Sequence, residues 1–461
     1  MTQKPLDVAM PESASALISA AIELNDLYSA AAVYPQADSE QRNALKPILC
    51  GRRRDVLRLA RWEHTPASVL ALLAGLDDEA VRLRVEKNPA TQSETLTEIF
   101  NSDDSKELIN LIAQHAHTDA EVLLIIVRQV STPAIIRAVA KNPNASETVL
   151  TLIESRFGDQ FDAELASHEN TPAAMLEKLY GRGNHFVQAA VAAHPHCPQA
   201  VLEQAISHEE AVVVRHAAGN ESLSARSLDY LAAHPDYSVR RAVAGQKRLP
   251  VTLIKELAQD ESEYVRRAIA ARQDLTEKII DILLHDSDHW VRQRVSLNPR
   301  LSAEQLQLLA EDEDKEVRRS VARNSKTPQA LLKRLAKDKE TWVRAAVANQ
   351  PNTPSTLLAE LAEEKEVDVL AAVAHNPNAT QTTLQNLTQS MVADVRRGVV
   401  TNKTANRETL LPLLEDPYYL NRLLLIQSQG LRPEDKWSLH DDPDPAVRFT
   451  LFSWFSRQYQ Q

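Results

Sequence analysis

A segment of 26 residues recurs along most of this 461-residue chain, and the repetition constrains its fold more than any other feature. From Val239 to Val447 a new unit starts every 26 residues, with Val at almost every start and Arg after most of them. The same spacing, with small shifts, extends backward to a degenerate unit near Asp55, which makes about sixteen units. Because stacked repeats bury their apolar faces against their neighbours, a chain of this length needs no single large core.

The pattern within each unit predicts two short helices. The starting Val and the apolar residue four positions later, as in Val317 and Val321, share one helical face. This helix ends at a position that is often Asn, whose side chain we expect to bond the neighbouring loop backbone. A second helix starts at Thr-Pro, where Thr is expected to cap free N–H groups and Pro to take the first helical position. Helices of about ten residues are not stable alone, so stability must come from stacking.

Composition agrees with an all-helical array, because Gly is scarce at nine residues while Ala, Leu and charged residues dominate. We therefore predict an all-α, right-handed α-solenoid of about sixteen two-helix repeats with helical caps. The predicted parts are an N-terminal helical cap at 1–50, the repeat array at 51–446, and a truncated last repeat with a C-terminal cap at 447–461. In the N-terminal cap we expect one helix over the run from Ala14 to Val33 and another from Ser39 to Leu49.

The net charge of −11 argues against a general nucleic-acid binder, although it leaves room for a local basic stripe. Cys50 and Cys197 are too few and too far apart for a disulfide framework or a Cys-rich metal site, and they fit a reducing compartment. No signal peptide and no apolar run of membrane-spanning length is visible. We expect a cytoplasmic protein of bacterial type that has no contact with a membrane.

One unit carries Val343-Arg344 at its start, then Pro351-Asn352-Thr353-Pro354, and then Leu357-Leu358. Through these residues the repeat resembles the leucine-rich repeat variant family over about residues 55–450. It implies a superhelix of paired short helices, related to HEAT and Armadillo arrays. One group of that family holds an iron–sulfur cluster through several N-terminal cysteines. Only Cys50 lies near the N-terminus here, and such clusters usually need four thiolates, so no cofactor is expected.

The Arg that follows the starting Val recurs in nine units, as in Arg240 and Arg318. In one interpretation these arginines form an anion-binding stripe along one face. In the other, each Arg pairs with the acid of the turn before it, such as Asp312 or Asp338, and ties adjacent layers. There is nearly one such acid for each Arg, which favours the structural tie.

Residues that depart from the repeat are the candidates for a binding surface. Residues 301–350 are locally basic, and aromatic residues precede three unit starts. The basic residues either contact phosphates or form a solvated helix face. The aromatic residues either form a stacking groove for bases or for a peptide, or they pack between layers or cover a turn. The candidate set is Arg319, Arg323, Lys326, Lys333, Arg334, Trp342, Arg267 and Trp290.

Three further clusters have a structural and a functional interpretation. The run Arg52–Arg54, with Arg58 and Arg61, is either the solvated side of the first repeat or a binding patch. His115 and His194 occupy the Asn position of their units, which favours a structural role over metal binding. The segment 449–455 carries three Phe and one Trp and is either the closing cap or an exposed docking patch.

The sequence thus predicts a non-enzymatic scaffold that binds a protein partner on its concave face, as a monomer. No catalytic, metal or cofactor residue is predicted, because no nucleophile elbow, phosphate loop or helical His–Glu motif occurs. Two alternatives stay open: a HEAT-like nucleic-acid-binding or DNA-repair-type protein, and a cofactor-associated repeat protein that has lost the iron–sulfur cysteines.

Overall fold

The computed structural model describes residues 9–102 and 105–460, which form thirty-four α-helices and two short 3-10 helices without any strand. These helices group into two compact units. One unit is Cys50–Ile269, and the other combines Met1–Leu49 with Ala270–Gln461. The predicted all-α solenoid of two-helix repeats is confirmed, because the described residues contain sixteen first helices that start at the predicted spacing.

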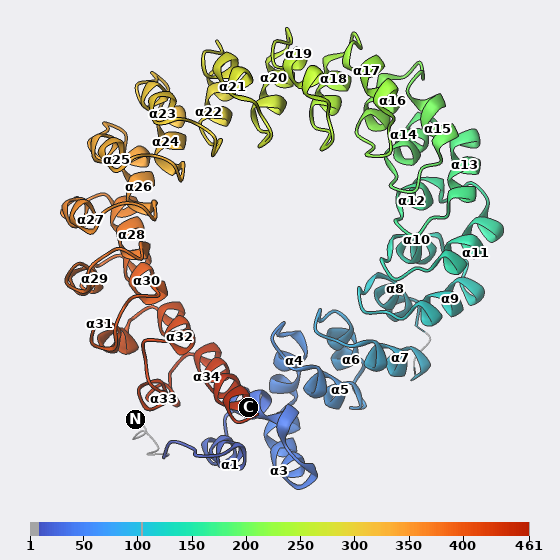
Figure 1. Cartoon of the computed structure of the whole chain (residues 1–461). Coiled ribbons are helices and arrows are strands. Elements are labelled where there is room, and N and C mark those ends of the chain that lie inside the picture. The colour runs from blue at the N-terminus through green and yellow to red at the C-terminus, as the bar shows by residue number, and fades with distance from the viewer. Residues whose placement is uncertain (1–8, 103–104, 461) are drawn as a thin grey trace. The chain divides into compact units, whose positions relative to one another are not determined.

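In the Cys50–Ile269 unit the helices alternate between two rows, and the successive first helices from α4 to α18 pack on each other. The first helices of the repeats form an inner row on the inner side of this unit's curve, and the second helices form an outer row (Figure 1). The inner row is α4 (Arg53–Arg61), α6 (Glu79–Glu86), α8 (Lys106–Gln114), α10 (Pro133–Lys141), α12 (Asp162–Ser167), α14 (His185–Ala193), α16 (Ala211–Ala218), α18 (Tyr237–Ala244) and α20 (Glu263–Ala270). The outer row is α5 (Ala67–Ala74), α7 (Ser93–Ser102), α9 (Ala120–Gln129), α11 (Glu147–Phe157), α13 (Ala173–Arg182), α15 (Gln199–Ala205), α17 (Ala225–Ala232) and α19 (Val251–Leu257).

The Ala270–Gln461 part of the second unit has the same two rows. Its inner row is α22 (His289–Val295), α24 (Lys315–Arg323), α26 (Thr341–Asn349), α28 (Val367–His375), α30 (Ala393–Thr401), α32 (Tyr419–Gln427) and α34 (Pro445–Gln458). Its outer row is α21 (Glu277–Leu284), α23 (Ala303–Leu309), α25 (Gln329–Leu335), α27 (Ser355–Leu361), α29 (Gln381–Thr388), α31 (Arg407–Leu410) with η2 (Leu411–Glu415), and α33 (Pro433–Trp437).

The core lies between the two rows. The starting Val317 and its partner Val321 are completely buried, as are Leu332 and Val343 of the next helices. A fully buried aliphatic side chain contributes about 1.5–3 kcal/mol, so four to six such residues per repeat outweigh the weak helix propensity of segments this short.

The Asn that ends many of the first helices ties consecutive repeats together. Asn324 donates through Nδ2 to the carbonyls of Ser296 and Asn298 in the preceding repeat, at 2.8 and 3.0 Å. Its Oδ1 accepts from the N–H of Lys326. The predicted bond from this Asn to neighbouring loop backbone is therefore confirmed. Equivalent pairs of bonds are made by Asn88, Asn142, Asn220, Gln246, Gln350, Asn376 and Asn402.

The Thr-Pro step does not cap the second helix as predicted. Thr353 Oγ1 donates to the carbonyl of Val347 at 2.6 Å, and Thr327 bonds Val321 in the same way. Both carbonyls belong to the first helix of the same repeat, whose last carbonyls lack partners within the helix. The capping prediction is wrong because the hydroxyl reaches back to those carbonyls. Pro354 is the residue before the second helix, one position earlier than expected.

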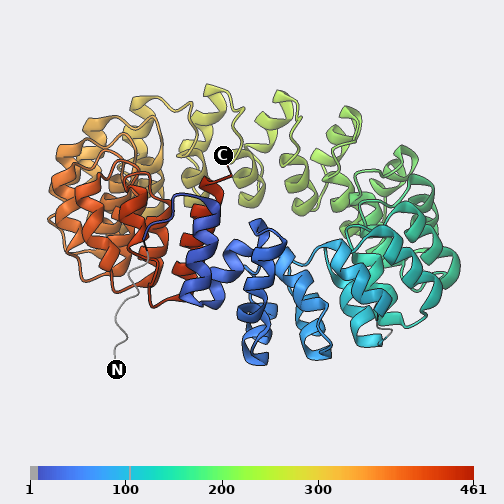
Figure 2. The same cartoon turned by 90° about the horizontal axis from the view of Figure 1, so that it is seen from below.

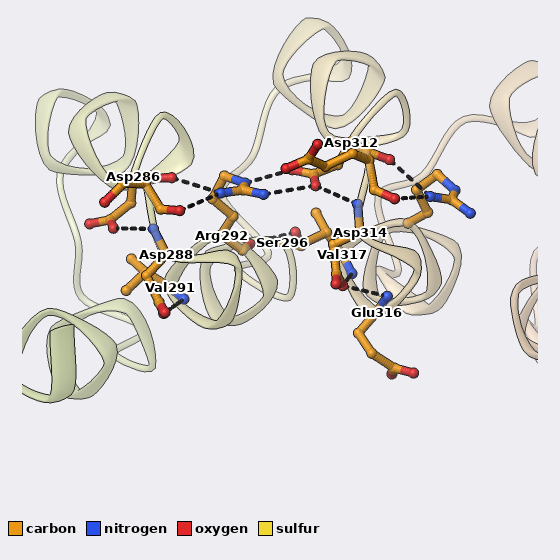
Figure 3. Close-up of polar contacts among 12 residues, drawn as sticks. Asp286, Asp288, Val291, Arg292, Ser296, Asp312, Asp314, Glu316 and Val317 are labelled. Atoms are coloured by element: carbon orange, nitrogen blue, oxygen red, sulfur yellow. Dashed lines mark hydrogen bonds and ion pairs between the residues drawn. The ribbon is translucent and has the colours of Figure 1, made fainter.

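The recurring Arg also ties consecutive repeats, but in the opposite direction to the prediction. The Arg292 guanidinium donates to the carboxylate of Asp312, twenty residues later, at 2.6 and 3.0 Å. Its Nη1 donates to the carbonyls of Asp286 and Ser287 in the turn before it (Figure 3). The acid thus comes from the following turn, and the preceding turn supplies only backbone oxygens. The ion pairs of this Arg–acid series are Arg240–Asp260, Arg292–Asp312, Arg318–Asp338, Arg344–Glu364, Arg396–Asp416 and Arg422–Asp442.

The N-terminal segment forms α1 (Ala14–Leu24), α2 (Leu27–Val33), η1 (Tyr34–Gln36) and α3 (Ser39–Cys50). The single helix predicted from Ala14 to Val33 is wrong. Asn25 takes a left-handed conformation with φ of 48°, which ends α1, and Asp26 then caps α2 by accepting from the Ser29 N–H. Asn and Asp are the residues that best tolerate such a break.

The N-terminal helices pack against the last helix of the same unit. α2 and α1 both contact α34, and Figures 1 and 2 show these blue and red helices side by side. Asp26 Oδ1 accepts from Arg448 Nη2 at 2.7 Å, and Tyr459 donates through its hydroxyl to the Pro11 carbonyl. Arg448 is the last member of the recurring Arg set, and its acid partner is Asp26. We call this contact between α34 and the helices α1 and α2 the terminal junction.

Candidate binding face

The face of the inner row that points away from the core is set by helical geometry. Residues one before, two after and six after the starting Val lie on the side opposite the buried face, which the starting Val forms with the apolar residue four positions later, because each residue turns the helix by about 100°. In the repeat that starts at Val317, these residues are Glu316, Arg319 and Arg323. Val317 is buried while Arg319 is half-buried and Arg323 is exposed, as the geometry requires. We call this surface of each unit its inner face.

Three of the predicted residues meet on the inner face of the Ala270–Gln461 part. The Arg319 guanidinium lies over the Trp342 ring of the next repeat, 5.5 Å from its centre. The same guanidinium pairs with Glu316 at 3.3 Å. Arg323 is exposed at the end of the same helix, α24. A cation above an aromatic ring, with a further exposed Arg one turn away, resembles the anchors of protein interfaces.

The remaining predicted residues do not join that cluster. Lys333 and Arg334 lie on α25 in the outer row, where Arg334 pairs with Glu311 at 2.9 Å. Lys326 is exposed in the loop after α24. Trp290 begins α22, two repeats before Trp342. The last predicted residue is Arg267, which belongs to the Cys50–Ile269 unit.

The aromatics that precede the starting Val point to solvent. Tyr264, Trp290 and Trp342 are each close to half exposed, at 43%, 44% and 49%. Two of these rings also contact the preceding layer: Tyr264 stacks on Tyr237, and Trp342 lies under the Arg319 guanidinium. Their exposure follows from position, since the residue before the starting Val lies on the side of the helix that faces away from the core.

A second, more continuous cluster lies on α16, α18 and α20 of the Cys50–Ile269 unit. Arg215, Arg241 and Arg267 follow the starting Val by two positions in three consecutive repeats. Tyr237 and Tyr264 stack at 5.5 Å between ring centres, and the Arg267 guanidinium lies 5.1 Å from the centre of the Tyr264 ring. The sequence prediction missed Arg215, although the period of 26 residues from Arg241 would have found it.

A hollow of about 560 Å³ opens between α16 and α18. It is lined by Arg215, Tyr237, Arg241, Gly219 and Gly245, among others. The two glycines end consecutive first helices, at the position where Arg323 and His375 stand in other repeats. Because glycine has no side chain there, the space between the helices stays open. A similar hollow of about 540 Å³ lies between α4 and α6 and is lined by Arg54, Leu57, Arg58, Arg61, Trp62, Glu63 and Arg84.

The histidines and cysteines have structural surroundings. His115 and His194 each place Nε2 against a backbone carbonyl of the preceding repeat, at 3.0 and 2.9 Å, so their predicted structural role is confirmed. Burial lowers the pKa of both histidines, which favours neutral rings. Burial raises the pKa of the Cys197 thiol to about 11. In the part of the chain that the structure describes, no three His, Cys, Asp or Glu side chains gather as a metal site.

The 449–455 segment belongs to α34. Phe452 and Phe455 are buried, and both lie against the Trp437 ring at 5.5 and 5.2 Å between centres. Lys436 sits 4.1 Å from the Trp454 ring centre. An exposed docking patch at this end is therefore ruled out for these two phenylalanines.

Among residues 9–102 and 105–460, no helix combines the length and the apolar character that crossing a membrane requires.

Comparison with known proteins found no matching family model and no matching curated protein. Among solved structures, Kap121p bound to Nup53p is 11% identical, with 98% of this chain and 57% of that chain covered and a TM-score of 0.34. Kap121p bound to Pho4p is 12% identical, with 96% and 50% covered and a TM-score of 0.23. An engineered protein is 15% identical, with 94% and 99% covered and a TM-score of 0.14. The chain spans about half the length of the Kap121p chains, and at these TM-scores the similarities carry no argument about function.

Proposed function

We propose that the chain is a scaffold that binds a protein partner through the inner face of its repeats. The observation that carries the proposal is where its exposed aromatic side chains lie. Among the described residues, one strongly exposed aromatic, Tyr230, stands on the outer row. All others begin helices of the inner row: Phe186, Tyr237, Tyr264, Trp290, Trp342 and Tyr419.

Aromatic and Arg side chains supply most of the binding energy of protein interfaces, because they bury a large area at a low entropic cost. Leaving them in water on one face of a solenoid is unfavourable unless that face is covered in use. The pairing of Arg319 with Trp342 brings both residue types to one spot. The proposal takes the chain as a non-enzymatic cytoplasmic monomer of the leucine-rich repeat variant type.

Photo-crosslinking tests the proposal with a matched pair of positions. Trp342 on α26 and Leu308 on the outer-row helix α23 are 49% and 47% exposed. Each is replaced by p-benzoylphenylalanine in the full chain, and the crosslinked proteins from the native cell are identified by mass spectrometry. We expect one specific adduct from position 342 and none from position 308. Equal or absent crosslinking at the two positions contradicts the proposal.

A second candidate function, nucleic-acid binding, is favoured by the hollow between α4 and α6. Arg54, Arg58, Arg61 and Trp62 line it together, and an aromatic ring and guanidinium groups in one hollow suit a stacked base and its phosphates. A gel shift with single-stranded and duplex DNA and RNA at low salt tests this function, because phosphate contacts are strongest there. A shift that is lost in Arg58→Gln/Arg61→Gln supports it, and no shift at low salt rejects it.

A further inference from the structure

We propose that the groove formed by α16, α18 and α20 binds an extended acidic segment of the protein partner, with a carboxylate at every third residue. The inference rests on the proposed function, since it specifies the partner chemistry of one part of the inner face. Four observations carry it: unpaired charge, the spacing of the arginines, an aromatic platform, and an open hollow.

The charge of Arg215 and Arg241 is not neutralised by the chain. Both side chains are exposed, and neither has an ion-pair partner within the described residues. Two other inner-face arginines do have one: Arg319 pairs with Glu316, and Arg397 pairs with Asp394 at 2.9 Å. The groove therefore presents two available guanidinium groups, although the whole chain carries a net charge of −11.

The acid at the rim of the hollow does not compensate these charges. Glu221 lines the hollow but pairs with Lys247, with 2.5 Å between the charged atoms. Asp236 caps α18 by accepting from the Ser238 N–H. Hydrogen bonds to Ser238 are the main cause of the lowered pKa of Asp236, and the charge of Arg215 contributes less to it. An incoming carboxylate would thus meet a net positive site.

The spacing of the Arg row selects an extended ligand. Arg215, Arg241 and Arg267 occupy the same position in consecutive layers, and packed helices are about 8–10 Å apart. A polyproline II chain rises about 3.1 Å per residue with three residues per turn, so its side chains at every third residue point the same way about 9 Å apart. One carboxylate per layer then meets one Arg per layer without distortion of either partner.

The aromatic platform supports the backbone of such a ligand. Tyr237 and Tyr264 stack at an interplanar angle of 30°, and both are strongly exposed at the edge of the Arg row. Aromatic surfaces are the usual contacts of polyproline II segments, which bring little conformational entropy to lose on binding. A ligand that alternates acidic residues with Pro satisfies both the rings and the guanidinium groups.

The open hollow gives one carboxylate room to enter between layers. Gly219 and Gly245 both have right-handed backbone conformations, with φ of −82° and −79°, so neither is required by the turn. A Cβ at Gly245 would lie 3.4 Å from its nearest neighbour, the Ala242 carbonyl oxygen, which is an ordinary contact. A larger residue at this position is thus compatible with the fold and would fill the hollow.

Fluorescence anisotropy with the full chain tests the inference. The probe is a fluorescein-labelled (Glu-Pro-Pro)5 peptide, and its control is an isomer of the same composition with contiguous glutamates. We expect (Glu-Pro-Pro)5 to bind at least fivefold more tightly than the isomer at 50 mM salt. Arg215→Gln/Arg241→Gln should weaken binding about two- to thirtyfold, as the loss of two exposed charge pairs predicts. Arg226→Gln/Lys255→Gln removes two charges from the outer row and should leave binding unchanged.

Gly245→Leu distinguishes the effect of the hollow on binding from the effect of net charge, because it fills the space and leaves every Arg in place. It should weaken binding at least fivefold with an unchanged helical circular dichroism spectrum. Equal binding of the two peptides, or full binding by Arg215→Gln/Arg241→Gln, overturns the inference. Tighter binding of a (dT)15 oligonucleotide than of the peptide overturns it in favour of a nucleic acid. The crosslinking positions 342 and 308 lie outside this groove. Specific crosslinking at position 342 together with no binding of the peptide would therefore reject this inference and leave the proposed function in place.

Discussion

The terminal junction should hold the N-terminal helices on α34 through one ion pair that can be removed cleanly. Asp26 has two roles: it caps α2 through the Ser29 N–H, and it accepts from Arg448 at 2.7 Å. Asn caps helices about as well as Asp, so Asp26→Asn keeps the first role and loses the second. The matched control is Asp38→Asn, because Asp38 accepts from the Gln41 N–H at the start of α3 and is exposed, without an ion pair among the described residues.

The magnitude follows from the burial of the pair. Both side chains are 18% exposed, which makes this a partly desolvated hydrogen bond between charged groups. Such bonds contribute about 1.5–3 kcal/mol, and we take about 2 kcal/mol here. Because about 1.4 kcal/mol corresponds to a factor of ten, local opening of α2 should become about thirtyfold more frequent in Asp26→Asn.

Amide hydrogen exchange measures this opening directly, since it reports local stability without the assumption that the whole chain unfolds in one step. The amides of α2 and of the facing part of α34 should exchange about thirtyfold faster in Asp26→Asn than in the unmodified chain. In Asp38→Asn their exchange rates should not change. A double-mutant cycle with Arg448→Gln should give a coupling energy of about 1–2 kcal/mol. Equal exchange in the two Asn variants, or a coupling energy near zero, would refute the reasoning.

Three further predictions concern the repeats. Asn324→Ala should destabilise its repeat by about 2 kcal/mol, because two buried carbonyls lose their donor. Asn324→Gln should destabilise it by less than half of that, because Gln350 makes the same two bonds in its own repeat. Hydrogen exchange of the α24 amides distinguishes the two variants. Burial alone would raise the pKa of Asp338, but the hydrogen bond and charge of Arg318 outweigh it and lower that pKa below its ordinary 3.8. The ionised pair therefore stabilises the fold above about pH 4 and loses this contribution as the pH falls through the lowered pKa, so an acid titration followed by circular dichroism should show a loss of helix there that is smaller in Asp338→Asn. The buried Cys197 thiol, with its pKa raised to about 11, should react with a disulfide reagent at pH 8 only as fast as the chain opens, and Cys197→Ala should remove that slow phase.

The repeat frame was predictable because it depends on spacing. Val317 and Val321 at helical spacing, together with the Asn that follows, identify the two-helix unit and its loop bond without any knowledge of three-dimensional contacts. The direction of the Arg292 ion pair was not predictable in the same way. Asp286 stands six residues before Arg292 and Asp312 stands twenty residues after it, and only the stacking distance between layers decides which carboxylate is within reach.

The terminal junction and the binding groove depend on contacts that a repeat pattern does not encode. Asp26 and Arg448 are 422 positions apart, and nothing in either local sequence indicates the other. For the groove, Arg267 was a predicted site residue, but its value as part of a row depended on Arg215 and Arg241 and on the two glycines that leave the hollow open. The exposure of Trp342 could have been derived from its helical position, had the inner and outer rows been assigned first.

Hydroxyl-radical footprinting tests most directly the central claim that the inner face binds the partner. Tyr237 on α18 and Tyr230 on α17 are of one residue type and lie in the same unit, at 46% and 57% exposure, one on the inner row and one on the outer row. The full chain is footprinted alone and in the complex isolated from the cells that make it. We predict that binding of the partner lowers the oxidation of Tyr237 at least fivefold and leaves the oxidation of Tyr230 unchanged. If the partner covers the other unit instead, the oxidation of Trp342 should fall by the same factor. Protection of Tyr230 with no protection of any inner-row aromatic would contradict the account.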